Sequence, residues 1–184
     1  MKRLLPVALG ALLFALPQTA EAGFGLTAQI ASVENATASS GTIYTNRQHR
    51  YPTLDYKSGR FLLQVAALDL INSIGFEDNL LFGVNGFYQM RKAPMSETVT
   101  GVTQLGATFD YDQIGEDTNF TTIQFAGRMG AQVNKKMGFG IYIVPQIGVT
   151  LASDEFFISG PSDDSTSNLS LAVGGQVQVS VWMK

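Results

Sequence analysis

Few residues of this chain have the chemistry of a catalytic group. His49 is the only histidine and lies within Asn46-Arg47-Gln48-His49-Arg50. Two neighbouring guanidinium groups disfavour protonation of its ring, which would suit a general base. Covalent catalysis also requires a nucleophile beside the base, and no serine follows His49 at the second position. The sequence therefore favours a solvated loop histidine over a catalytic one, and we predict a protein that is not an enzyme.

Metal binding is the second chemistry to consider, and three of the acidic pairs in the chain are candidates: Glu116-Asp117, Asp154-Glu155 and Asp163-Asp164. Carboxylate oxygens are the ligands that divalent cations such as calcium prefer. None of the three spacings matches a dedicated calcium loop, and the chain has no cysteine to supply thiolates. The sequence thus predicts solvated acidic loops, with neither a metal site nor a cofactor.

The elements that position these residues follow a period of two, which places alternate side chains on opposite faces of a strand. In residues 169–181 an aliphatic row alternates with a row of small and amide side chains. Residues 122–133 and 138–151 repeat the pattern, and 24–30, 79–91 and 104–111 follow it too. Residues 42–56 and 61–71 fit less clearly. We therefore predict an all-β protein of about eight antiparallel strands.

The strands are longer than those of a typical soluble sandwich and suit a tilted strand that crosses a membrane. The polar rows are poor in Lys and Glu and rich in Gly, Ser, Thr and Gln, as expected for a narrow, hydrated lumen. The sequence therefore predicts an up-and-down transmembrane β-barrel. Its lumen should hold Arg128, Gln124, Gln146, Gln176 and Gln178. Its lipid-facing surface should include Val177, Val179, Val181, Ile141, Ile143 and Phe125.

The start of the chain has the pattern of a secretory signal peptide. Lys2 and Arg3 precede an apolar run that ends near Leu16, and a small-residue stretch ends at Ala22. The run is shorter than a membrane-spanning helix needs. We thus expect residues 1–22 to be a signal peptide and residues 23–184 to form one barrel domain.

The net charge of −3 and the lack of a basic patch exclude a nucleic-acid partner.

Loop lengths predict the topology. Residues 57–60, 91–98 and 134–137 form short connections, whereas 35–50 and 153–167 are long and polar. Short periplasmic turns and longer external loops are typical of outer-membrane barrels. Eight strands with both termini on the periplasmic side place all three short turns on one rim.

Arg128 requires a partner, because its parity directs a guanidinium into the middle of the predicted lumen. The pattern of residues 61–71 permits Asp69 to face inward at a comparable height. We expect a lumenal pair of Arg128 and Asp69 that plugs or gates the pore, with solvation of Arg128 by water and glutamine side chains as the alternative.

The signal peptide, the alternation and the polar loops resemble those of small bacterial outer-membrane barrels of the OmpA/OmpX kind. A local stretch, Leu54-Asp55-Tyr56-Lys57-Ser58-Gly59-Arg60-Phe61 followed by Leu81-Phe82-Gly83-Val84, is similar to strands of the MipA/OmpV family. The chain departs from such barrels at its end, where Met183 and Lys184 follow Trp182 instead of a final aromatic residue that the assembly machinery recognises.

The resemblance implies location in the cell outer membrane, contact with its lipids including lipopolysaccharide, and contact with the barrel-assembly machinery during biogenesis. We expect a structural or surface-interaction role, with an envelope protein or small ligand bound at the external loops. A narrow channel or carrier for a small or apolar molecule is the first alternative, because the glycines of the polar rows leave room for a path. A lipid-modifying enzyme and a soluble carrier are further alternatives.

Overall fold

The computed structural model describes residues 23–38, 41–44, 52–67, 79–114, 118–133, 137–153 and 168–183. Nearly all of them lie in nine strands: β1 (Gly23–Ala38), β2 (Gly41–Tyr44), β3 (Thr53–Ser58), β4 (Phe61–Ala66), β5 (Asn79–Pro94), β6 (Val99–Ile114), β7 (Thr118–Val133), β8 (Met137–Ser153) and β9 (Asn168–Met183). The segment interpreted as a signal peptide, residues 1–22, lies outside the described residues. Within them, no helix has the length and apolarity needed to span a membrane.

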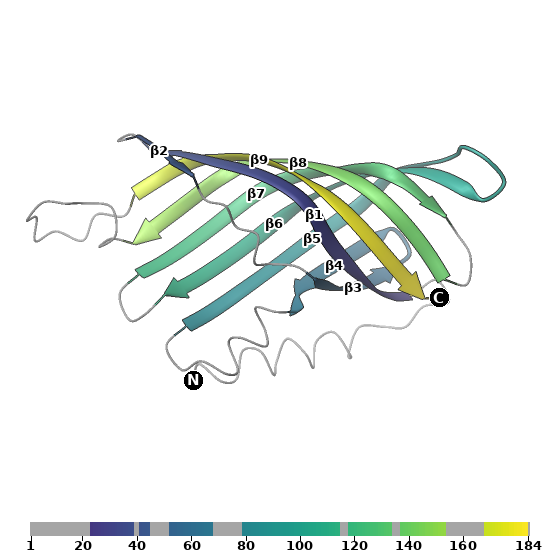
Figure 1. The fold of residues 1–184 in the computed structure, drawn as a ribbon, viewed down its shortest axis with the longest axis horizontal. Coiled ribbons are helices and arrows are strands. Elements are labelled where there is room, and N and C mark those ends of the chain that lie inside the picture. Colours follow the sequence, from purple (N-terminus) through teal and green to yellow (C-terminus); the bar gives the residue numbers. More distant parts are fainter. Residues whose placement is uncertain are drawn as a thin grey trace, which may run out of the picture.

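The strands close into a barrel in which neighbours in sequence are neighbours in space (Figure 1). β1 completes the cylinder by pairing with β9, from Phe24 opposite Met183 to Ala38 opposite Ser170. On its other side β1 pairs with β3 near its start and with β2 near its end, so that β2 and β3 together occupy one position. The prediction of an all-β, antiparallel, up-and-down barrel of eight strands is therefore confirmed.

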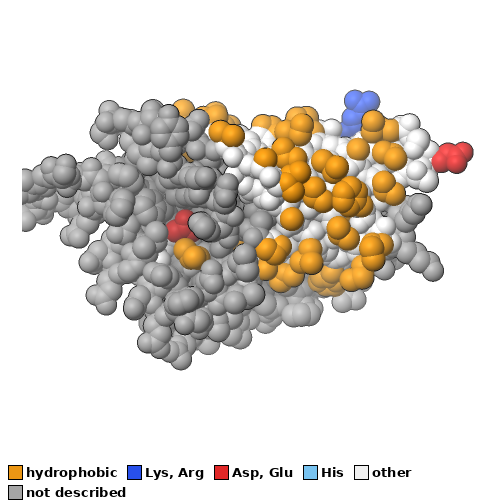
Figure 2. Space-filling view, in the orientation of Figure 1, with side chains coloured by type: hydrophobic (Ala, Val, Ile, Leu, Met, Phe, Trp, Pro, Cys, Tyr) orange, Lys and Arg blue, Asp and Glu red, His pale blue; other side chains and the backbone are white. Residues whose placement is uncertain are grey.

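Side-chain alternation divides the barrel into two surfaces, and β8 shows this most clearly. Its odd-numbered residues from Phe139 to Leu151 are exposed on the outside, whereas the residues between them face the interior. Figure 2 shows the outward aliphatic and aromatic side chains as a broad orange band over the barrel, with Lys or Arg atoms in blue at its upper edge. The described part of the chain is thus apolar outside and largely polar inside.

The strand ends that flank the three predicted short connections lie on one rim. Two of these connections are shorter than predicted, because β3 continues to Ser58 and β5 to Pro94. We call this rim, where β1 begins and β9 ends, the terminal rim, and the opposite one the distal rim. The β3–β4 turn of the terminal rim needs the positive φ of Gly59, 56°, which glycine adopts without a steric penalty. The prediction of a long loop over residues 35–50 is wrong for 35–38 and 41–44, because Asn35 pairs with Tyr44 and Ala38 with Gly41. Their small and β-branched residues extend the ladder above the barrel wall.

The β7–β8 ladder is interrupted at mid-barrel, between the Ala126–Gln146 and Met129–Ile143 pairs. Pro145 lies in this gap and has no N–H to donate to β7. The interruption falls beside Arg128, the one charged residue that the sequence directs to the centre of β7. Local backbone irregularity and the buried cation therefore coincide.

Candidate functional site: the lumenal arginine cluster

Arg128 lies inside the barrel and is only 2 % exposed. Its Nε–H donates to Gln178 Oε1 at 3.0 Å, its Nη1 to Gln104 Oε1 at 2.6 Å and its Nη2 to Ser180 Oγ at 2.7 Å. Each of the three guanidinium nitrogens thus donates to a neutral acceptor on β6 or β9. Such charge-assisted bonds are stronger than those between neutral groups.

Two aromatic rings flank the same guanidinium. The centroid of the Tyr142 ring lies 3.3 Å from Arg128 Cζ, and that of Phe87 lies 6.0 Å away. A guanidinium stacked over a ring face is stabilised by the ring's quadrupole, more so when both are removed from water. Tyr142 donates its hydroxyl proton to Gln132 Oε1 at 3.2 Å, so its polar end has a partner as well.

A carboxylate joins the cluster through two hydroxyl groups. Ser180 and Thr27 share a hydrogen bond of 2.6 Å, and Thr27 Oγ1 donates to Asp55 Oδ2 at 2.5 Å. Asp55 also accepts from Thr53 at 2.7 Å and from Gln64 at 3.1 and 3.2 Å. Hydrogen bonds therefore connect the buried cation on β7 with a buried carboxyl group on β3.

The cluster draws on every position of the barrel wall. Gln64 Nε2 donates to Thr27, and Asn85 on β5 donates to Gln64 Oε1 at 3.5 Å, which brings in the two remaining strands. The contact between Thr27 and Ser180 crosses the seam where β1 meets β9, residues that are 153 positions apart in sequence. We define the lumenal cluster by the residues Thr27, Asp55, Gln64, Asn85, Gln104, Arg128, Tyr142, Gln178 and Ser180.

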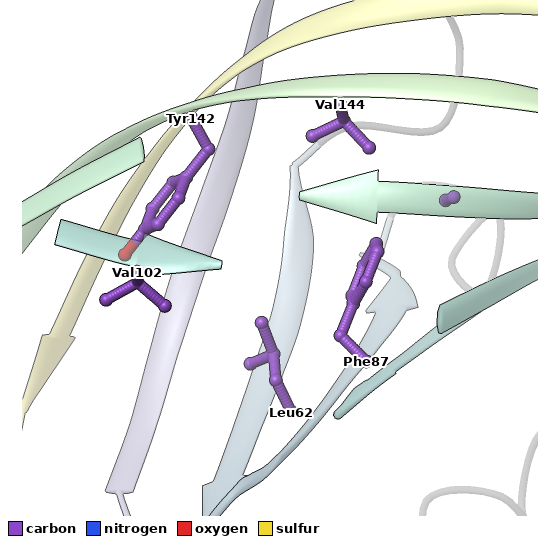
Figure 3. Close-up of a cluster of buried hydrophobic side chains, with 6 residues drawn as sticks. Leu62, Phe87, Val102, Tyr142 and Val144 are labelled. Carbon is purple, nitrogen blue, oxygen red and sulfur yellow. The ribbon is translucent and has the colours of Figure 1, made fainter. Parts of the chain in front are cut away.

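An apolar layer packs beside the lumenal cluster. Leu62, Phe87, Val102, Ala126, Tyr142 and Val144 form a buried group, with Trp182 against it. In Figure 3, Tyr142 and Val144 point into the interior from β8, and Leu62 and Phe87 point toward them from β4 and β5. At this level the lumen is packed with aromatic and aliphatic side chains, which close the gaps between the polar groups.

The glycines of the polar rows make room for these rings. A Cβ on Gly130 would lie 1.9 Å from Ile141 O and 2.8 Å from Tyr142 Cδ1, and one on Gly106 would lie 1.9 Å from Gly86 O and 2.8 Å from Phe87 Cδ1. These distances are too short for real Cβ contacts. The expectation that lumenal glycines leave space for a solute path is therefore wrong at Gly106 and Gly130, where the backbone of the neighbouring strand and an aromatic ring occupy that space.

A small cavity lies between the lumenal cluster and the terminal rim. Its lining includes Asp55, Lys57, Arg128, Tyr142 and Trp182, and its volume of about 20 Å³ is measured as space for the centres of water molecules. One water needs roughly 10–15 Å³ by that measure. The cavity therefore suits one or two waters held by charged groups, and it is too small for an organic substrate.

Beyond the lumenal cluster, toward the distal rim, the interior is lined by amides and hydroxyls. Gln178 donates to Gln176 and Gln176 to Gln146, each at 3.1 Å. Thr108 donates to Gln124 at 3.3 Å, and Thr122 and Thr150 share a hydrogen bond of 3.0 Å. The predicted lumenal glutamines thus lie in the interior and bond to each other or to threonines.

Sequence reasoning placed Arg128 in the lumen and paired it with Asp69, which lies outside the described residues, so this pairing stays a prediction. Among the described residues, the carboxyl group linked to Arg128 through hydrogen bonds is that of Asp55. The sequence does contain a pattern that places Asp55 in the lumen, because Asp55 alternates with the exposed Leu54 on β3 and is therefore directed inward. The remaining acceptors, Gln104 and Ser180, belong to the polar rows of their strands.

The residues predicted to face lipid lie on the outer surface. Phe125 is 74 % and Ile143 61 % exposed, and Ile141 and Val181 are exposed as well. Val177 and Val179 are partly exposed and pair across strands with Ile143 and Ile141. His49 and the three acidic pairs lie outside the described residues. Among the residues that are described, no three His, Cys, Asp or Glu side chains gather as metal ligands would.

Comparisons with known proteins identify no family. A scan against protein-family models finds no match, and a comparison with curated protein sequences finds none either. The resemblance to OmpA/OmpX barrels and to the MipA/OmpV family therefore stays a prediction. Among solved structures, the chain matches Ail, the attachment invasion locus protein of Yersinia pestis, with 8 % identity over 85 % of this chain and 97 % of that one. The TM-score of this match is 0.16.

Proposed function

We propose that this protein is an integral barrel of the bacterial outer membrane, with a non-enzymatic role in envelope structure or surface interaction. The observation that carries the proposal is the placement of apolar side chains outside a closed barrel and of Arg128, Asp55 and the glutamines inside it. A soluble barrel has the reverse arrangement, because water must meet its outer face. Contiguous apolar surface beyond a few hundred Å² is rare on soluble monomers and marks a contact with lipid or another protein.

The height of the apolar surface matches a membrane. The outward row of β8 from Phe139 to Leu151 covers twelve residue steps, or about 40 Å along the strand at roughly 3.3 Å per residue. A tilt of about 40° reduces this to roughly 30 Å along the barrel axis, close to the apolar band of about 25 Å in outer-membrane barrels. The row is therefore long enough to cross the hydrocarbon layer once.

The proposed orientation places the terminal rim in the periplasm and the distal rim outside the cell. Short turns on the terminal rim support this assignment. In this orientation the external loops carry any binding to an envelope protein or small ligand, and lipids including lipopolysaccharide surround the barrel. The signal peptide and the barrel-assembly machinery would deliver the chain there.

A filled lumen favours this role over a channel. Side chains fill the interior of eight-stranded barrels, and here the lumenal cluster and its apolar layer cross the interior at mid-barrel. For a lipid-modifying enzyme, the chain offers a single histidine with no serine two residues after it. A mass shift in lipid A on expression of the protein would contradict the non-enzymatic proposal.

Membrane fractionation combined with heat-modifiable gel mobility tests the proposal directly. We expect the mature protein in the outer-membrane fraction, extracted only by detergent, and migrating faster unheated than boiled because the closed barrel resists dodecyl sulfate. A protein that stays folded and dissolved in plain buffer would contradict the proposal, since the exposed valines and isoleucines would then need a protein partner.

A charge placed at the middle of the outer row should weaken folding into a bilayer. We expect Ile143→Lys to lower the free energy of folding into phospholipid vesicles by about 2–4 kcal/mol, and Met137→Lys by about 0–1 kcal/mol. The two residues share a strand and a face and are 61 % and 64 % exposed, so they differ mainly in depth. Urea titration followed by fluorescence of Trp182, the only tryptophan, measures both. Equal effects would show that Ile143 does not lie in hydrocarbon.

A further inference from the structure

The terminal rim carries a pair of arginines beside aromatic rings on the outer face of the barrel. Arg60 lies exposed in the β3–β4 turn, and its Nη1 donates to Tyr88 Oη at 3.3 Å. The Tyr88 ring packs edge-on against Phe61, with centroids 5.0 Å apart. Both rings are solvent-exposed in the isolated chain. The hydrogen bond to Tyr88 holds the Arg60 guanidinium at the outer surface of the barrel, away from the opening of the lumen.

Arg91 lies on the same face by register. It pairs with Thr103, which lies between the inward Val102 and Gln104 and so faces outward. The backbone N–H of Gln89 donates to Arg60 O at 2.8 Å, so Arg60 lies beside Gln89 in the barrel wall. Gln89 is two residues before Arg91 in the sequence. The long side chains of Arg60 and Arg91 can therefore reach one ligand.

The surface below these arginines is apolar. Tyr88 pairs with Leu105, and Leu105, Phe61 and Met90 are all more than half exposed. Lys92, the next cation along β5, pairs with the inward Val102 and so points to the other face. The outer face thus presents two guanidinium groups above an aromatic and aliphatic surface, while the neighbouring cation faces away from it.

We propose that Arg60 and Arg91 bind the phosphate of an anionic phospholipid in the leaflet at the terminal rim, with its acyl chains against Phe61, Met90 and Leu105. The guanidinium fork matches phosphate oxygens two at a time, and it is less strongly hydrated than an ammonium group. Tyrosine suits the interface, because its ring is apolar and its hydroxyl reaches the headgroup. This inference rests on the proposed membrane location and adds the lipid class that the rim selects.

Native mass spectrometry of the folded mature protein in detergent tests the site, with phosphatidylglycerol and phosphatidylcholine as probes. We expect one phosphatidylglycerol to be retained in preference to phosphatidylcholine. Arg60→Gln and Arg91→Gln should each lower its affinity about fivefold, from roughly 1 kcal/mol per cation near an anionic lipid surface. Lys92→Gln, which removes the same charge from the opposite face of β5, should change it less than twofold.

Several results would overturn the site. Equal retention of the two lipids by the wild type is one, and an equal loss of phosphatidylglycerol in Lys92→Gln is another, since it would indicate nonspecific attraction. Displacement of the lipid by millimolar inorganic phosphate would assign the arginines to free phosphate. Heat-modifiable mobility verifies that each variant is folded. If a glutamine variant does not fold, Arg91→Lys takes its place and is expected to bind the lipid with intermediate affinity. Loss of that mobility in the wild type would instead refute the barrel proposal.

Discussion

Replacement of Arg128 by methionine is expected to lower the free energy of unfolding by about 3–5 kcal/mol, as is usual when one partner of a buried charge pair is removed. Methionine keeps most of the length of the side chain, so the cavity left is small. It donates no hydrogen bonds, and Gln104, Gln178 and Ser180 would each lose the bond that Arg128 makes to them. The Asp55 carboxylate would remain buried without the cation to which Ser180 and Thr27 connect it.

A double-mutant cycle separates the charge pair from the lost hydrogen bonds. We expect Arg128→Met combined with Asp55→Asn to cost less than the sum of the two single changes, with a coupling of about 0.5–3 kcal/mol. Lys92→Gln serves as the control, because it removes a cation that is exposed and faces away from the proposed lipid site, and its effect should remain within about 0.5 kcal/mol. Urea unfolding from vesicles measures the four proteins of the cycle and the control. A stability unchanged by Arg128→Met would show that the lumenal cluster does not hold the barrel together.

Alternation was enough to predict the barrel and the inward position of Arg128, because the period of two is a local property of each strand. Alternation did not predict which side chains of residues 61–71 face inward. Leu62 and Val65 are both buried although they point to opposite faces, so the segment is apolar on both sides and its parity is hidden. The inward position of Gln64 depended on that parity.

Contacts across the lumen lie beyond any local pattern. Thr27 meets Ser180 only because β1 and β9 close the barrel, and their register shifts at a bulge between Gln29 and Ala31. A slip of one residue would turn every side chain of β1 to the other face. The apolar layer was hidden for a related reason: Phe87 and Val144 interrupt polar rows, and only the three-dimensional arrangement shows that Gly106 leaves space for the Phe87 ring.

Removal of the Arg128 and Tyr142 side chains together should convert a closed lumen into a conducting one. The two groups stack at mid-barrel and are each 2 % exposed. Their loss would join the small cavity at the terminal rim to the region lined by glutamine and threonine side chains. In planar bilayers we expect no resolved current steps from the wild type and discrete steps from Arg128→Ala/Tyr142→Ala. With the cation gone, Asp55 and Asp110 remain in the interior, so the current should favour cations.

The matched control removes two side chains from the outside of the same strands. Met129 and Ile143 follow Arg128 and Tyr142 in sequence, pair with each other, and point outward. Met129→Ala/Ile143→Ala should therefore leave the bilayer current at the wild-type level. Steps in the wild type itself would favour the narrow channel over the structural role. A silent Arg128→Ala/Tyr142→Ala barrel that keeps its heat-modifiable mobility would show that Phe87, Val144 and Leu62 block the lumen without the arginine, which would then act on stability alone.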